Sequence, residues 1–96
     1  MKTLEEIKNI LAKHKPELKQ KYKVKEIGIF GSRVRKEKKI NDIDILVEFE
    51  EPIGFFQFMD LEEYLEKLLS AKVDLVSKKA LKPYIGKHIL EETVYL

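Results

Sequence analysis

Two aspartates, Asp42 and Asp44, stand on either side of Ile43 at the start of an apolar run. Side chains two positions apart on a strand share a face, so both carboxylates would point the same way while Ile43 and Ile45 face the core. Placing carboxylates on a partly buried surface is costly unless a cation compensates them. The pair therefore indicates a site for a positively charged ligand.

A third carboxylate, Asp74, and the pair Gly31-Ser32 extend this pattern. Three carboxylates on one face would take up protons unless divalent cations neutralised them, and oxygen ligands of this kind suit Mg²⁺. Ser32 beside a glycine, at the start of a helix, could hold phosphates through its hydroxyl and through backbone N–H groups. The combination predicts a site for a metal and a phosphorylated substrate.

A structural interpretation of each motif stands beside the functional one. An Asp-x-Asp pair at the entrance of a strand is often a turn or cap, and a short motif matches by chance in many proteins. Asp74 considered alone is weaker evidence for a site than the Asp-x-Asp pair. The joint pattern of strand, Gly-Ser, helix, Asp-x-Asp and a third Asp on a third strand favours a functional site.

The elements that must position these residues can be predicted from periodicity and turn signals. Thr3 and Glu6 form a capping box for an amphipathic helix that Pro16 should end or restart. Strands are predicted over 24–30, 43–49 and 72–77. Further helices are predicted to open at Ser32, to run over 55–70 after Pro52 and Gly54, and to open at Pro83.

The candidate site constrains the topology. Ser32 follows the first strand and Asp42 precedes the second, so both reach one site only if these strands are antiparallel. Asp74 follows a helical crossover, so its strand is most simply parallel to the second. We therefore predict an α/β (α+β) fold in which helices pack on a small mixed sheet of three strands or slightly more.

The length and composition limit which kinds of protein this chain can be. The chain has 96 residues, so we expect a single domain over 1–96. It has no cysteine, which excludes disulfide and thiolate chemistry. There are 19 basic and 17 acidic residues, a net charge of +2, which argues against direct nucleic-acid binding. Because we see no signal peptide or apolar span, we expect a cytoplasmic location and no membrane.

The motifs resemble those of the nucleotidyltransferase superfamily that includes DNA polymerase beta. Its signature, Gly-Ser, a spacer and Asp-x-Asp between apolar residues, corresponds to Gly31-Ser32 and Asp42-Ile43-Asp44. The short length, FGSRVR, VDLV around Asp74 and the ending ILEETVYL are similar to the minimal nucleotidyltransferases (MNT), the antitoxins of HEPN/MNT toxin-antitoxin pairs. The resemblance covers nearly the whole chain and implies the nucleotidyltransferase fold.

This resemblance assigns roles to particular residues. Asp42 and Asp44 would bind two Mg²⁺ ions, and Asp74 would join at one of them and help to activate the acceptor hydroxyl. Gly31 and Ser32, with Arg35, would hold the triphosphate of ATP. Lys36 departs from the pattern, because many relatives have glycine after the residue that matches Arg35.

The resemblance also implies a reaction. AMP would pass from ATP to a hydroxyl, expected to be a tyrosine, of a partner HEPN ribonuclease toxin, which is thereby silenced. The alternative is a non-catalytic binding module that neutralises the toxin by direct contact. Retention of the three acids with Gly31 and Ser32 favours the enzyme, since a pure binder gains nothing from a repelling cluster.

Two surface features remain open at this stage. A basic strip for RNA or for an acidic partner could be formed by six lysines, although a solvated face is the better interpretation. They are Lys13, Lys15, Lys19, Lys21, Lys23 and Lys25. The apolar residues from Phe55 to Met59 exceed what one helical stripe would bury. Core packing, a partner surface and self-association are all consistent with them.

Overall fold

The computed structural model describes residues 3–30, 42–80, 91 and 93–96. Two α-helices, four strands and a short 3₁₀ turn are present in this part of the chain. They are α1 (Leu4–Tyr22), β1 (Val24–Phe30), β2 (Asp42–Phe49), α2 (Phe55–Leu69), β3 (Lys72–Ser77), η2 (Lys78–Ala80) and β4 (Val94–Tyr95). The predicted strands and the helix over 55–70 are thus confirmed to within one residue. The helices predicted to open at Ser32 and Pro83 lie outside the described residues.

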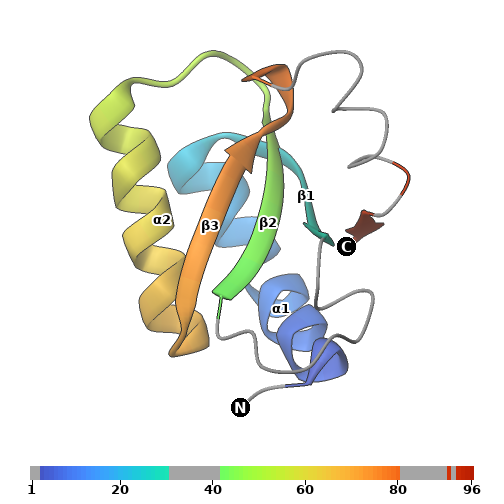
Figure 1. The fold of residues 1–96 in the computed structure, drawn as a ribbon. Coiled ribbons are helices and arrows are strands. Elements are labelled where there is room, and N and C mark those ends of the chain that lie inside the picture. Colours follow the sequence, from blue (N-terminus) through green and yellow to red (C-terminus); the bar gives the residue numbers. More distant parts are fainter. Residues whose placement is uncertain (1–2, 31–41, 81–90, 92) are drawn as a thin grey trace.

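The sheet is mixed, as the placement of the acids required. Its strand order is β3-β2-β1-β4 (Figure 1). β1 pairs antiparallel with β2, and β2 pairs parallel with β3 after the α2 crossover. This confirms the mixed α/β fold with helices packed on the sheet.

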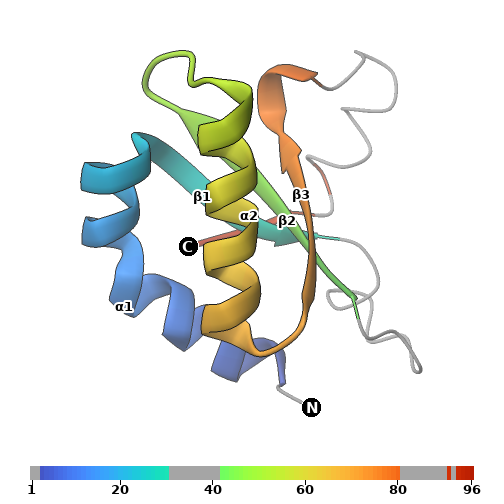
Figure 2. The same cartoon turned by 90° about the vertical axis from the view of Figure 1, so that its left-hand side faces the viewer.

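Both helices pack on the same face of the sheet (Figure 2). On β2, the alternating residues Ile43, Ile45 and Val47 are fully buried beneath them. The helices contribute apolar side chains with exposures of at most 1%: Ile7, Leu11, Leu18, Leu61, Leu65 and Leu69. The period-2 pattern of the strand and the 3.6-residue pattern of the helices therefore meet in one core.

Helix α1 begins at the predicted capping box. The Thr3 Oγ1 accepts a hydrogen bond from the Glu6 backbone N–H at 3.2 Å, and the Glu6 carboxylate accepts one from the Thr3 N–H at 3.5 Å. The prediction that Pro16 ends or restarts this helix is wrong, because α1 continues through it to Tyr22. Buried Leu18 and Tyr22 lie beyond the proline, and their packing offsets the single backbone hydrogen bond that proline removes.

Strand β4 was not predicted as a separate element. It pairs antiparallel with the edge of β1, joining Tyr95 to Gly28 and Val94 to Ile29. Its approach depends on glycine, because a Cβ atom at Gly28 would lie 2.5 Å from the Thr93 Cγ2. Neither helix in the described part of the chain is long and apolar enough to span a membrane.

Candidate active site

The second face of the sheet, which α1 and α2 do not cover, carries two of the predicted acids, Asp44 and Asp74. We call it the acid face. On β2, Asp44, Leu46 and Glu48 alternate with the core residues and point to it. Asp44 is half-buried and Asp74 is exposed. The acid face is thus accessible to solvent at Asp74 while still backed by a packed sheet.

Asp44 and Asp74 are direct register partners in the parallel β2–β3 ladder. Neighbouring strands lie about 4.8 Å apart, and residues paired in register point to the same face. The structure therefore brings together two carboxylates that are separated in sequence by the whole of α2. Asp42 lies at the start of the same strand and pairs with Lys72 in the backbone register. Its side chain lies outside the described residues.

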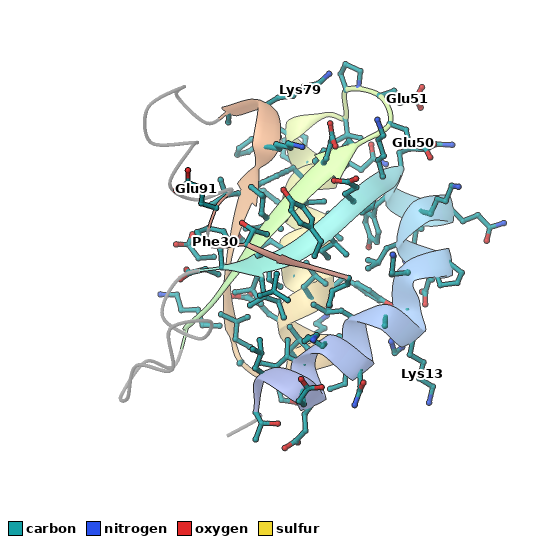
Figure 3. All side chains as sticks on the ribbon, turned by 90° about the vertical axis from the view of Figure 1, so that its right-hand side faces the viewer. Lys13, Phe30, Glu50, Glu51, Lys79 and Glu91 are labelled. Atoms are coloured by element: carbon teal, nitrogen blue, oxygen red, sulfur yellow. The ribbon has the colours of Figure 1, made fainter. Side chains whose placement is uncertain are left out.

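Strand β1 ends beside Asp44. Phe30, the last residue of β1, is the antiparallel register partner of Asp44. β1 therefore ends directly beside Asp44, and Figure 3 labels Phe30 at this end of the strand. Gly31, Ser32 and Arg35 themselves lie outside the described residues, so their predicted contact with phosphate stays a prediction.

A glutamate on α2 positions the start of β3. The Glu66 carboxylate accepts a hydrogen bond from the Val73 backbone N–H, with an Oε2 to N distance of 3.0 Å. Val73 precedes Asp74, so this contact fixes the backbone beside the acid. A side chain acting across a helix-to-strand turn leaves no recognisable spacing in the sequence, which is why Glu66 was not identified there.

Two lysines on or beside the acid face were also missed. Lys72 is exposed and is the register partner of Asp42, so it brings a positive charge to the same edge of the ladder. Lys78 pairs with Glu48 at 3.7 Å toward the other end of the acid face. The β2–β3 register was needed to find the first of them, because a lysine at the start of a strand is common in sequences.

Asp44 and Asp74 are candidate ligands for a divalent cation. Within the described side chains, no group of three His, Cys, Asp or Glu residues could hold a metal ion. Asp44 and Asp74 supply carboxylate oxygens, the ligand type that Mg²⁺ prefers, and like charges directly opposite on neighbouring strands are unfavourable without a cation. The donor chemistry therefore fits Mg²⁺, with Asp42 as the proposed third ligand.

The lysine-rich end of α1 is engaged within the chain. The Lys15 Nζ donates a hydrogen bond to the Leu96 carbonyl oxygen at 2.6 Å, and Lys19 pairs with Glu50 at 3.8 Å. Lys21 lies over the rings of Tyr22 and Tyr64, at 5.4 and 5.7 Å from their centroids. These contacts favour the interpretation of a solvated face over a nucleic-acid surface.

Tyr64 is poorly suited to act as a nucleophile. Burial raises the pKa of its hydroxyl to about 12, together with a hydrogen bond to Glu17 and the nearby charge of that carboxylate. Its ring packs on Tyr22, with 5.7 Å between the ring centroids. These observations indicate a structural role in joining α1 to α2.

The sequence is similar to that of known nucleotidyltransferases. The nucleotidyltransferase domain model matches residues 11–96. Protein adenylyltransferase MntA of Thermococcus cleftensis is 55% identical over 97 residues, covering 100% of this chain and 98% of that protein.

Solved structures share the fold. A "putative minimal nucleotidyltransferase" superposes with a TM-score of 0.75 at 30% identity, covering 94% of this chain and 95% of that one. A chain from the complex of a tri-AMPylated Shewanella oneidensis HEPN toxin with an MNT antitoxin superposes with a TM-score of 0.69 at 21% identity. The match covers 93% of this chain and 70% of that one. The chain belongs to the nucleotidyltransferase domain family and is a nucleotidyltransferase.

Proposed function

We propose that this chain is a Mg²⁺-dependent protein adenylyltransferase that moves AMP from ATP to a hydroxyl of a HEPN-family ribonuclease and so acts as its antitoxin. The observation that carries this proposal is the direct pairing of Asp44 with Asp74 on the acid face. The high identity to MntA of Thermococcus cleftensis and the fold shared with the antitoxin of an AMPylated HEPN toxin support it.

The chemistry is a displacement at phosphorus. The oxygen of the acceptor hydroxyl, which we propose is a tyrosine, forms a bond to the α-phosphorus of ATP. The bond from that phosphorus to the bridging oxygen of the β-phosphate breaks, and pyrophosphate leaves. The hydroxyl proton passes to a base. We propose Asp74 as this base, because it is the exposed carboxylate of the Asp44–Asp74 pair.

Asp42, Asp44 and Asp74 are proposed to hold two Mg²⁺ ions, which when bound would neutralise negative charge on the triphosphate. Gly31, Ser32 and Arg35 are proposed to orient the triphosphate from the segment that begins directly after Phe30. Positioning of the two substrates is the main contribution of the protein in such a reaction. The packed core beneath β2 supplies the rigidity that this positioning needs.

A single incubation tests the proposal. The chain, ATP and Mg²⁺ are mixed with the HEPN-family protein of the same organism, and the partner is analysed by intact and tandem mass spectrometry. We expect AMP on a partner tyrosine and loss of its ribonuclease activity. An unmodified partner that is nevertheless silenced would instead establish the non-catalytic binding module.

Nucleotide binding can be tested separately at the Gly-Ser pair. Hydrogen bonds to charged groups contribute about 1.5 to 3 kcal/mol each, so Ser32→Ala should weaken ATP binding in the presence of Mg²⁺ by roughly 10-fold or more. Titration calorimetry measures this affinity, and thermal unfolding serves as the control for the fold. Unchanged affinity would make the Gly-Ser pair merely structural.

A further inference from the structure

The start of α2 exposes an unusual amount of apolar surface. Phe55, Phe56 and Met59 are 70%, 82% and 48% exposed, and we call these three residues the α2 patch. The rings of Phe55 and Phe56 contact each other edge to face at 5.8 Å between centroids, so they form one continuous surface. Exposed clusters of this kind in water-facing helices mark interaction sites.

An apolar groove adjoins the α2 patch. Its volume is about 480 Å³, and its lining includes Phe49, Ile53, Phe55 and Phe58 together with Glu51 and Lys79. Phe49 and Phe58 pack edge to face at 6.2 Å between ring centroids and form part of its wall. Figure 3 shows Glu51 and Lys79 at the same end of the molecule. A groove beside exposed aromatics is suited to receive an apolar anchor side chain from a partner.

The segment that carries the α2 patch is rich in acidic residues. Residues 50–63 contain five acidic side chains and no lysine or arginine: Glu50, Glu51, Asp60, Glu62 and Glu63. Lysines border this segment as well. Lys67, on the same helix, pairs with Glu63 at 3.2 Å, and Lys79 lines the groove. On α1, Lys19 pairs with Glu50 at 3.8 Å, and Lys21 lines a pocket with Asp60. The acids of residues 50–63 still outnumber these lysines. The complement of this surface is an apolar patch bordered by basic side chains.

A second copy of this chain fits the surface poorly. In a two-fold pairing through the α2 patch, the acidic border of one copy would face the acidic border of the other, which is unfavourable. The two phenylalanines expose roughly 300 Å² between them, whereas a stable interface buries about 800 Å² on each partner. The α2 patch therefore needs a partner of different charge that extends beyond it.

We propose that the α2 patch and its groove are the docking surface for the protein substrate, through an apolar anchor bordered by basic residues. This inference rests on the proposed function, in which the acceptor hydroxyl arrives on a separate protein. α2 begins after β2 ends and covers the core side of the sheet, so the α2 patch lies away from Asp44 and Asp74 (Figures 1 and 2). A partner docked there leaves the acid face open to receive its acceptor segment.

Two substitutions test the docking surface by different physics. Phe56→Gln removes apolar contact at a largely exposed position and keeps good helix propensity. Asp60→Lys reverses one charge of the acidic border, and Glu5→Lys, an exposed acid on α1, is its matched control. The affinity for the HEPN-family protein of the same organism is measured by titration calorimetry without ATP, at low and high salt. Thermal unfolding and ATP-Mg²⁺ affinity check the fold and the acid face.

We expect Phe56→Gln to weaken partner binding by about 10-fold or more, as truncating a central contact does. Asp60→Lys should weaken it less and reduce its salt dependence, while Glu5→Lys leaves it unchanged. Wild-type affinity in both variants, or no binding by the wild type, would overturn the docking surface. So would a wild-type dimer in sedimentation that Phe56→Gln converts to monomer. Binding that depends on the α2 patch without AMP transfer would refute the proposed function but support the docking surface.

Discussion

The two faces of the sheet differ in role, and strand β2 contributes side chains to both. Ile43, Ile45 and Val47 face the helices and are fully buried, while Asp44 on the other face is half-buried and pairs with Asp74. One position along the strand thus separates a residue that stabilises the fold from one proposed for chemistry. The difference teaches that stability and activity should respond separately to substitutions at neighbouring positions.

The largest effect on stability is expected at Ile45. Replacing a fully buried isoleucine by alanine leaves a cavity and costs about 2 to 5 kcal/mol. Ile45→Ala should lower the free energy of unfolding by this amount in urea titrations, while the transfer rate per folded molecule at low temperature stays within a few-fold of wild type. A complete loss of activity in the folded variant would show that the two faces are not separable.

The converse variant is Asp44→Asn, which keeps the side-chain volume and removes the charge. Because weakening even the groups that support a metal ligand costs about 10- to 100-fold, loss of a proposed ligand should lower the transfer rate by at least about 100-fold. Its melting temperature without metal should match or slightly exceed that of wild type, because the substitution also removes one of two like charges that face each other. The rise in melting temperature on adding Mg²⁺ and ATP should be lost, and a full shift in an Asp42→Asn, Asp44→Asn double variant would contradict the metal site.

A link between the two faces is expected at Glu66, whose carboxylate on α2 accepts from the Val73 N–H. Glu66→Ala removes this hydrogen bond and should cost about 1 kcal/mol of stability. The transfer rate should fall several-fold as well, because Asp74 follows Val73 on the strand that loses its anchor. Hydrogen exchange at the Val73 amide provides the direct measurement, and the exposed Glu63→Ala is the control on the same helix. Unaltered exchange would show that β2 alone fixes β3.

The smallest effect has the opposite sign. Asp74→Asn removes one of two like charges that are direct partners in the ladder, so it should stabilise the protein by a few tenths of a kcal/mol in EDTA, on the order of a cross-strand pair. The same variant should lose transfer activity. Asp60→Asn, on the exposed side of α2, is the neutral control. A destabilised Asp74→Asn would mean that the two carboxylates do not repel each other in the fold.

Much of this arrangement could be predicted from the sequence. The alternation over 43–49 gave the two faces of β2, and the need to bring Asp74 to Asp42 and Asp44 gave the mixed topology, which the structure confirms. The alternation is a local sequence pattern. The topology follows from connecting the predicted strands in the simplest way that brings the three acids together. The family resemblance was confirmed by the comparisons.

Other features depend on tertiary contacts and could not be predicted. β4 has only two residues, too few to show alternation, and it exists through its register with β1. The sequence prediction placed a helix end at Pro16, because proline inside a helix removes a backbone hydrogen bond. The packing of Leu18 and Tyr22, which keeps the helix intact, cannot be read from the local sequence. The Glu66 contact and the register between Asp42 and Lys72 likewise require the folded sheet.

If Asp44 and Asp74 act together as proposed, a chain under synthesis becomes competent for catalysis only after β3 has been made. Chains emerge from the ribosome N-terminal end first, so Asp42 and Asp44 appear before α2 and well before β3. A nascent or proteolytically clipped chain that stops within α2 holds only part of the proposed ligand set and should be catalytically silent. Under the proposed roles, transfer activity would require the completed crossover, and an unfinished molecule would consume no ATP.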